Sequence, residues 1–591
     1  ALQGLLALAR RAGDVRGEER LLADLARFRD PSTSWPLARD WSARLLSEDH
    51  ADEAIDFLER YAPSADAHVA DRLEWELLLG SARLRAGDLA LARAHFEALA
   101  TQQWPELSTL ALATLALREQ RAFEALDLLD DAARLASYSA NGRRRAHALL
   151  GEAFLLTHDL ERARTHLTLA TEAALADEAR DASRTRIDAG GRDVVERATC
   201  SVVGERLGLH TVALLAQTHA LLGDALEAAR VIEDTQSRSL RGPQGALDRE
   251  ALRAWAAHTE LGFVTWVVGA DFTLVVHVAP DASTAWERIA RGRVELEQAA
   301  RRLRESALAS RAADALSRPA LDIAGELFPP SIVARIRASG AHVQPRLLLL
   351  AHGPLEALPF ELLPWPALTG RDDVALLTLP GLPCAAPGPE PQADAFTHWN
   401  LLGAPLDSAG RELLLGAREE LATVFALRPE SRLSTGAAFD RARLFDALRS
   451  HAPLHLATHL FGACGERGAR LGTASLVTSD SEPVCADDIA ALAPELPIAL
   501  LSACWSGGGD FVDAEGLLGT ARAFLENGTR NVLVTQWPVE DGAAAWYGVA
   551  FHRALLEGRS PCRAAATARA EMIVAGFAPA DWAAFRLLGR D

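Results

Sequence analysis

The pattern of apolar and polar positions changes once along this chain. Up to residue 248, apolar residues recur at helical spacing, and one small motif returns: an alanine followed three or four positions later by a large apolar residue. The aligned alanines are Ala54, Ala92, Ala125, Ala163 and Ala228, which are separated by 38, 33, 38 and 65 residues. Helix pairs repeating at about this length stack into solenoids, so we predict a helical-repeat domain over residues 1–248. An irregular helical bundle is the alternative.

After Gly242-Pro243 the apolar runs become short and rich in β-branched residues. Residues 262–269 and 273–278 predict a hairpin, and a charged helix is expected from about 283 to 308. Strands then alternate with helices, which predicts a mostly parallel sheet with helices on both faces. The expected strands are 347–351, 374–379, 399–403, two that end at His459 and Cys504, and 531–537; the expected helices are 417–425, 440–448 and 514–526. The Pro- and Gly-rich stretch 380–392 is expected to link two subdomains.

Composition narrows the class of protein. A chain of 591 residues is long enough for several domains, and its 49% apolar and 24% charged residues are typical of globular protein. A net charge of −19, with no basic stretch longer than Arg143–Arg145, argues against a nucleic-acid partner. Six cysteines without a framework spacing indicate free thiols in a reducing compartment, and no apolar run reaches membrane-spanning length. We therefore expect a cytoplasmic protein. Without an initiator Met or a cleavable signal pattern, we also expect a trimmed chain.

Two strand-end motifs near the C-terminus carry the candidate chemistry. One reads His-Leu-Ala-Thr-His and ends at His459; the other reads Leu-Leu-Ser-Ala-Cys and ends at Cys504, before a Gly-rich stretch. If the two strands are neighbours in a parallel sheet, both side chains emerge at its carboxyl edge, where open α/β sheets place their chemistry. A thiolate beside an imidazole is an activated nucleophile. This arrangement predicts a cysteine peptidase.

A series of further motifs gives the C-terminal half a family resemblance. Together they resemble the CHAT family, caspase-like proteins that commonly follow tetratricopeptide repeats, and the N-terminal motif resembles such a repeat. In chain order the motifs are Gly353–Glu361, Leu402–Ala404, Ala417–Glu420, His455–His459, Leu501–Cys504, Glu515–Gly519, Gln536–Asp541 and Trp582–Gly589. The shared order over roughly half the chain makes the resemblance specific.

The resemblance implies a caspase/separase-type α/β fold behind a helical solenoid. Residues 249–390 would form a pseudo-peptidase part and residues 391–591 the active part. By the same resemblance, His459 is the base that activates the thiol and Cys504 is the nucleophile. The backbone N–H groups of Leu460 and Cys504 would then bind the oxyanion of the tetrahedral intermediate.

Two positions depart from the family pattern. Leu460 follows the expected catalytic His where the family usually has Gly. Ser502 stands two positions before the nucleophile, where the related metacaspases have an Asp that recognises a basic substrate side chain. The simplest argument for cleavage after Arg or Lys is therefore missing.

Other residues are candidates for substrate binding, each with an alternative role. Asp510, Asp513, Glu515 and Asp541 could supply an acidic specificity pocket. Asp513 is equally suited to cap the helix that follows, and Asp510 to a solvated loop. Trp505 could line the substrate groove or pack in the interior.

The remaining polar candidates have plainer interpretations. His455 is expected to be a packed structural histidine, and His352 to belong to a turn before Gly353-Pro354. Cys464 and Cys485 could join the two strand-end residues as zinc ligands, but no short ligand spacing supports such a site. No metal and no cofactor is therefore predicted.

We thus expect a cysteine endopeptidase that cleaves a specific protein or peptide substrate. A regulatory protein or the substrate itself would bind the repeats and gate the activity, and family members of this architecture include immune and cell-death effectors, antiviral defence among their roles. The principal alternative is a catalytically inactive caspase-like scaffold, favoured by Leu460. A zinc-dependent hydrolase is a third reading, and no membrane partner is expected.

Overall fold

The computed structural model describes most of the chain as two compact units, Ala1–Asp224 and Ala225–Asp591. The described residues are 35, 39, 41–43, 45–46, 50–64, 66–101, 105–129, 135, 137–184, 209–236, 247–309, 317–339, 344–371, 373–383, 387–388, 393–406, 410–411, 414–462, 474–480, 483–492, 494–504 and 515–591.

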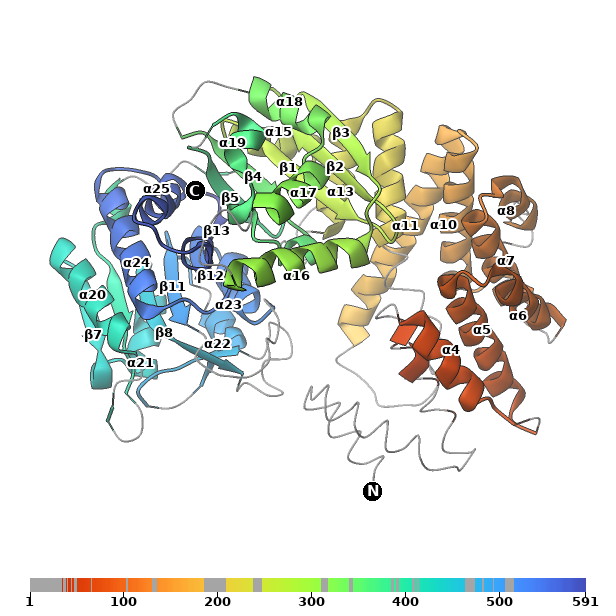
Figure 1. The fold of residues 1–591 in the computed structure, drawn as a ribbon, viewed down its shortest axis with the longest axis horizontal. Helices are drawn as coiled ribbons and strands as arrows, with labels where there is room; N and C mark the ends of the chain where they lie inside the picture. Colours follow the sequence, from red (N-terminus) through yellow and green to blue (C-terminus); the bar gives the residue numbers. More distant parts are fainter. Residues whose placement is uncertain are drawn as a thin grey trace. The chain divides into compact units, whose positions relative to one another are not determined.

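The first unit consists of helices joined by short turns (Figure 1). Its helices are α4 (Ala51–Arg60), α5 (Val69–Ala86), α6 (Leu89–Thr101), α7 (Pro105–Arg118), α8 (Ala122–Leu129), α10 (Ala140–Leu156) and α11 (Leu160–Arg184), with further helical residues at 209–221. Each helix packs on the next one in the chain. The predicted helical-repeat organisation is confirmed.

Small residues in the first unit lie where two helices approach closely. The repeated Ala54, Ala92, Ala125 and Ala163 are fully buried. Gly151 on α10 shows why size matters, because an added Cβ would lie 2.4 Å from the Leu167 side chain of α11. The turn between α5 and α6 begins at Gly87, whose φ of 87° is disfavoured for residues with a Cβ.

The second unit is built on one sheet of thirteen strands among the described residues. The spatial order is β7-β6-β8-β11-β12-β13-β5-β4-β1-β2-β3, with β9 and β10 continuing from the far end of β8. Most neighbours are parallel; the antiparallel pairs are β12–β13, β1–β2, β2–β3, β8–β9 and β9–β10. The strands are β1 (Phe263–Val268), β2 (Thr273–Val278), β3 (Thr284–Ile289), β4 (Arg346–Leu350), β5 (Ala375–Leu379), β6 (Asn400–Gly403), β7 (Arg432–Thr435), β8 (Leu454–Gly462), β9 (Ala474–Leu476), β10 (Val484–Cys485), β11 (Ala499–Cys504), β12 (Asn531–Thr535) and β13 (Phe585–Gly589). The predicted mostly parallel sheet is confirmed.

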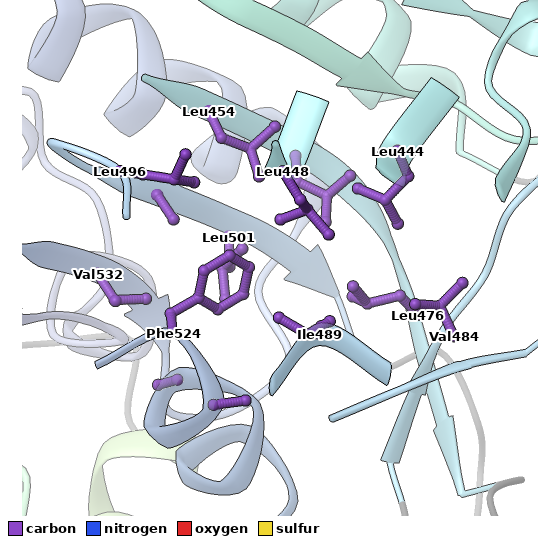
Figure 2. Packing of buried hydrophobic residues seen from close by; sticks show 14 of the residues in the cluster. Leu444, Leu448, Leu454, Leu476, Val484, Ile489, Leu496, Leu501, Phe524 and Val532 are labelled. Atoms are coloured by element: carbon purple, nitrogen blue, oxygen red, sulfur yellow. The ribbon is translucent and has the colours of Figure 1, made fainter. Parts of the chain in front are cut away.

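Helices cover this sheet. They are α13 (Ala225–Gln236), α15 (Arg249–Ala257), α16 (Arg293–Ala309), α17 (Ser317–Leu327), α18 (Pro330–Ala338), α19 (Trp365–Thr369), α20 (Leu415–Leu427), α21 (Arg441–Leu448), α22 (Ala486–Leu492), α23 (Glu515–Glu526), α24 (Asp541–Leu556), α25 (Pro561–Val574) and α26 (Pro579–Trp582). Near β8 and β11 they form two layers. Figure 2 shows Leu454, Leu501 and Val532 of the strands packed toward Phe524 and the leucines of α21.

The last strand joins the two predicted parts of this unit into one sheet. Strand β13 pairs antiparallel with β12 and parallel with β5. Its Arg586 is almost fully buried, donates a 2.7 Å hydrogen bond to the carbonyl of Glu356 and lies 3.3 Å from the Glu361 carboxylate. The strands of segments 249–390 and 391–591 therefore belong to one continuous hydrogen-bonded sheet.

The second unit begins at Ala225, earlier than the boundary predicted at residue 248. Helix α13, which carries the last aligned alanine, packs on β1, β2 and β3. Its Glu233 is fully buried, and accepts hydrogen bonds from the Thr265 hydroxyl at 2.6 Å and the backbone N–H of Leu382 at 3.1 Å. A helical pattern alone does not show which unit a helix packs against.

The helix expected from 283 to 308 is partly wrong. Residues Thr284–Ile289 form strand β3, paired along its length with β2, and α16 starts only at Arg293. Gly292 separates the two elements, because an added Cβ would lie 1.8 Å from the carbonyl oxygen of Ala270. The many charged residues of this segment obscured a half-exposed strand.

Candidate active site

The two strand-end motifs lie on neighbouring strands. β8 and β11 are parallel and in register from the pair Leu454–Ala499 to the pair His459–Cys504. The predicted adjacency is confirmed. Neighbouring strands are about 4.8 Å apart, so the backbones of His459 and Cys504 are directly opposite each other. Strand β11 ends at Cys504, and His459 is 3% exposed.

Strand β8 does not end at His459, as the sequence predicted. It continues to Gly462, and along one edge its pairing partner changes from one strand to another. Strand β6 pairs with β8 up to Ala457, and β9 takes over on the same side from Leu460 onward. The exchange requires Gly403 at the end of β6, where an added Cβ would lie 2.1 Å from the carbonyl oxygen of Ala457.

The backbone N–H of Leu460 faces the β11 side of β8. N–H and C=O groups point to alternate sides along a strand. The carbonyl of His459 points to the side of β8 where β6 and β9 lie, and accepts a hydrogen bond from the N–H of Val477. The N–H of Leu454 points to the β11 side, and donates to the carbonyl of Ile498. Leu460 is an even number of positions from Leu454, so its N–H has the same direction.

Ser502 is engaged by a carboxylate that the sequence did not single out as a site residue. Its hydroxyl donates to Oε2 of Glu420, on helix α20, at 3.3 Å, and both residues are buried. Glu420 belongs to a helix with the pattern Ala-Arg-Glu-Glu, in which its neighbour Glu419 is exposed. The helical spacing hints at an inward position, but only the packing of α20 on the sheet reveals it.

His455 is a fully buried histidine, as expected. Its ring stacks on that of His552 from helix α24, with centroids 5.2 Å apart and planes 14° apart. Nδ1 of His455 is 3.1 Å from Nε2 of His552. On its other side, Nε2 of His455 is 3.0 Å from Oε1 of Glu420, an ion-pair distance without good hydrogen-bond alignment.

The candidate specificity residues are placed only in part. Asp541 begins helix α24, and its carboxylate accepts a 3.3 Å hydrogen bond from the N–H of Gly416, so it connects the start of α24 to the start of α20. Glu515 begins α23, but its side chain is not described. Trp505, Asp510 and Asp513 lie outside the described residues.

The cysteines depart from the expectation of free thiols. Cys485 is disulfide-bonded, so it is not available as a zinc ligand. Cys562 is a free thiol, and burial raises its pKa well above the usual range, which makes it unreactive. Cys464 lies outside the described residues.

The described residues contain neither a cluster of metal-binding side chains nor a membrane-spanning helix. They contain no group of three or more His, Cys, Asp or Glu placed to hold a metal ion. In the same part of the chain, none of the helices has the length and apolar character that crossing a membrane requires.

The second unit has the caspase-like α/β peptidase fold. Residues 317–590 match the sequence model of the CHAT domain. The crystal structure of the Saccharomyces cerevisiae separase–securin complex superposes with a TM-score of 0.50 and 10% identity, covering 100% of this chain and 49% of that chain. At this identity the likeness concerns the fold alone.

Curated relatives are similar over short segments. Tetratricopeptide repeat protein 28 of Mus musculus is 34% identical over 111 residues, 18% of this chain and 4% of the relative. The Homo sapiens protein of the same name is 38% identical over 84 residues, 14% of this chain and 3% of the relative. The chain thus spans a small part of the length of these relatives.

Proposed function

We propose that this chain is a cysteine endopeptidase in which His459 and Cys504 form the catalytic dyad. The observation that carries the proposal is the register of β8 and β11, which sets the two residues opposite each other at the point where β11 ends. The caspase-like fold supports it, because open α/β sheets bind and transform ligands at the carboxyl ends of their strands.

The proposed chemistry needs only these two side chains and water. The imidazole of His459 takes the thiol proton, and the Cys504 thiolate attacks the scissile carbonyl carbon. As the tetrahedral intermediate collapses, the imidazolium gives its proton to the leaving amine, and a thioester forms. Water, deprotonated by the same imidazole, then hydrolyses the thioester and restores the thiol.

We propose that backbone N–H groups of Leu460 and Cys504 stabilise the oxyanion. The assignment of these two donors follows from the resemblance to the family. The side chain that replaces the family's Gly does not remove the donor. Each such donor is worth about 100- to 1000-fold in rate.

We propose a protein substrate and regulation through the helical unit. Stacked helix pairs offer an extended surface on which partner proteins bind. Partner or substrate binding there would shift the peptidase toward its competent state. A role as an immune, antiviral or cell-death effector in the cytoplasm belongs to this proposal and follows from the resemblance to the family.

The test is covalent labelling. A set of acyloxymethyl ketone peptides that differ in the residue next to the reactive group is incubated with the full chain, and mass mapping identifies the modified cysteine. We expect labelling at Cys504 that is lost in His459→Ala, and loss of proteolysis of the cognate protein in Cys504→Ala. The matched control, Cys562→Ala, removes an unreactive buried thiol and should leave labelling intact.

A non-catalytic scaffold is the competing function. It is favoured by one observation: Leu460 lies in an uninterrupted strand, where the family's Gly would allow a turn. A scaffold predicts no His459-dependent labelling of Cys504. It also predicts that any proteolysis seen with the wild-type chain is unchanged in Cys504→Ala. Either result would overturn the peptidase proposal.

A further inference from the structure

A network of buried polar side chains lies behind the strand pair that carries the proposed dyad. It joins Ser502, Glu420, His455, His552 and Arg428, all less than 6% exposed. These residues come from β11, α20, β8, α24 and the end of α20 respectively. They lie on the face opposite the apolar cluster of Figure 2, because Leu454, Leu456 and Leu501 alternate with them along the strands.

The guanidinium of Arg428 sets the donor and acceptor roles of the two histidines in this network. Arg can only donate, and its Nε donates to Nδ1 of His552 at 3.0 Å. Burial, followed by the nearby His455 and Arg428, holds the pKa of His552 well below its usual range, so its ring is neutral with the proton on Nε2. That proton points to Nδ1 of His455, at 3.1 Å.

His455 therefore carries its own proton on Nε2, facing the carboxylate. This atom is 3.0 Å from Oε1 of Glu420, and the second oxygen of Glu420 accepts from Ser502. One carboxylate thus connects two strands. It contacts β11 two positions before Cys504, and β8 four positions before His459.

The positive charge of Arg428 at one end of this network compensates the negative charge of Glu420 near the other end. Burial lowers the pKa of Arg428 to about 10, so it is charged at neutral pH, and it also donates to the carbonyls of Phe396 and His552. Hydrogen bonds satisfy the buried cation, and the buried carboxylate has the Ser502 hydroxyl at Oε2 and the 3.0 Å contact with His455 at Oε1. Gly548 of α24 leaves room for the carboxylate, because an added Cβ would lie 2.3 Å from Oε1 of Glu420.

We infer that Glu420 is a positioning residue for the proposed peptidase: its two carboxylate oxygens hold β11 through Ser502 and β8 through His455, and so fix the spacing of Cys504 and His459. This inference rests on the proposed function. Its reason is geometric, because reactive groups misplaced by about 1 Å lose on the order of 100-fold in rate. The burial of Glu420 argues against direct contact with substrate.

The test compares two substitutions on one helix. Glu420→Gln keeps the size of the side chain but removes the charge that faces His455, and Glu419→Gln makes the same change at the exposed neighbouring position. The rate of inactivation by the best acyloxymethyl ketone peptide is measured against its concentration, which separates the maximal rate from the apparent affinity. We expect Glu420→Gln to lower the maximal rate about 10- to 100-fold, with the affinity changed less than about threefold. Glu419→Gln should match the wild type.

A second pair keeps the inference testable if Glu420→Gln does not fold. Ser502→Ala removes the hydroxyl that reaches Glu420, whereas Ser502→Thr retains it. We expect the maximal rate to fall in the Ala variant and to be largely restored in the Thr variant, which a purely structural role would not produce at equal thermal stability.

The outcomes separate this inference from the proposed function. A wild-type chain that does not react at Cys504 overturns both. A reactive wild type whose folded Glu420→Gln and Ser502→Ala variants react at the same maximal rate overturns the positioning role alone. Variants altered only in apparent affinity also overturn it, because they would make Glu420 a specificity determinant.

Discussion

Oε1 of Glu233 lies 2.9 Å from Nε2 of His352, and both side chains are buried. The contact joins helix α13 to the second residue after strand β4, within the second unit. His352, interpreted from the sequence as part of a turn, is therefore a partner for a carboxylate that also accepts from Thr265 and Leu382. Helix α13 is fixed to the sheet by a polar contact as well as by packing.

Removing this carboxylate should strongly destabilise the second unit. Glu233→Ala leaves the Thr265 hydroxyl, the Leu382 N–H and the His352 ring without their acceptor, and loss of one partner from a buried network typically costs about 3–5 kcal/mol. Urea unfolding followed by tryptophan fluorescence measures the change in free energy of unfolding. Glu250→Ala, at an exposed position on α15, should stay within about 0.5 kcal/mol of the wild type. Equal stability of the two variants would contradict the assignment.

A second carboxylate should make stability depend on acid. Burial opposes ionisation of Glu260, but hydrogen bonds from the side chain and N–H of Arg346, and the charge of that guanidinium, hold the pKa of Glu260 at about 2. Because the pKa of Glu260 is lower in the folded state than in the unfolded state, its ionised carboxylate stabilises the fold. This stabilisation is complete above about pH 4.5, the unfolded pKa, and is lost as the pH falls toward 2, the folded pKa.

We therefore expect Glu260→Gln to remove part of the acid sensitivity of the second unit. At pH 7 the variant should be less stable by on the order of 2 kcal/mol, after allowance for partial solvent exposure, and the gap should close as pH falls from 4.5 to 2. Denaturant unfolding at several pH values measures this gap. A constant difference between the two proteins over that range would show that Arg346 does not lower the pKa of Glu260.

The sequence predicted the parts of this molecule that rest on local pattern. Helical periodicity and alternation gave the repeats and most strands, and the order of strand and helix gave the adjacency of His459 and Cys504. The insertion of β13 between β12 and β5 could not be predicted, because strand pairing across more than 200 residues leaves no local mark. Glu420 was missed for a related reason: its burial depends on which face of α20 meets the sheet.

Two glycines on one helix provide a test of close packing behind the site. Gly548 faces Glu420, whereas an added Cβ at Gly542, also on α24, would meet nothing within 4 Å. Gly548→Ala should destabilise by about 1–3 kcal/mol through overpacking. Gly542→Ala should be neutral or stabilising by up to about 1 kcal/mol, because it restricts the unfolded chain. Melting temperatures shifted in the same direction by both variants would contradict this arrangement.

Leu460 gives the sharpest test of the proposed oxyanion site, because its backbone and its side chain make opposite predictions. If the N–H that faces β11 stabilises the oxyanion, Leu460→Pro should lower the maximal rate of inactivation about 100- to 1000-fold, since proline has no N–H. The β8–β9 ladder should survive, because the carbonyl of His459, not the N–H of Leu460, accepts the hydrogen bond from Val477. The register with β11 directs the Leu460 N–H at the carbonyl of Cys504, so the variants are compared at equal thermal stability. Leu460→Gly retains the donor and should react at least as fast as the wild type. A Gly variant as slow as the Pro variant, with both folded, would assign the loss to the side chain and remove Leu460 from the oxyanion site.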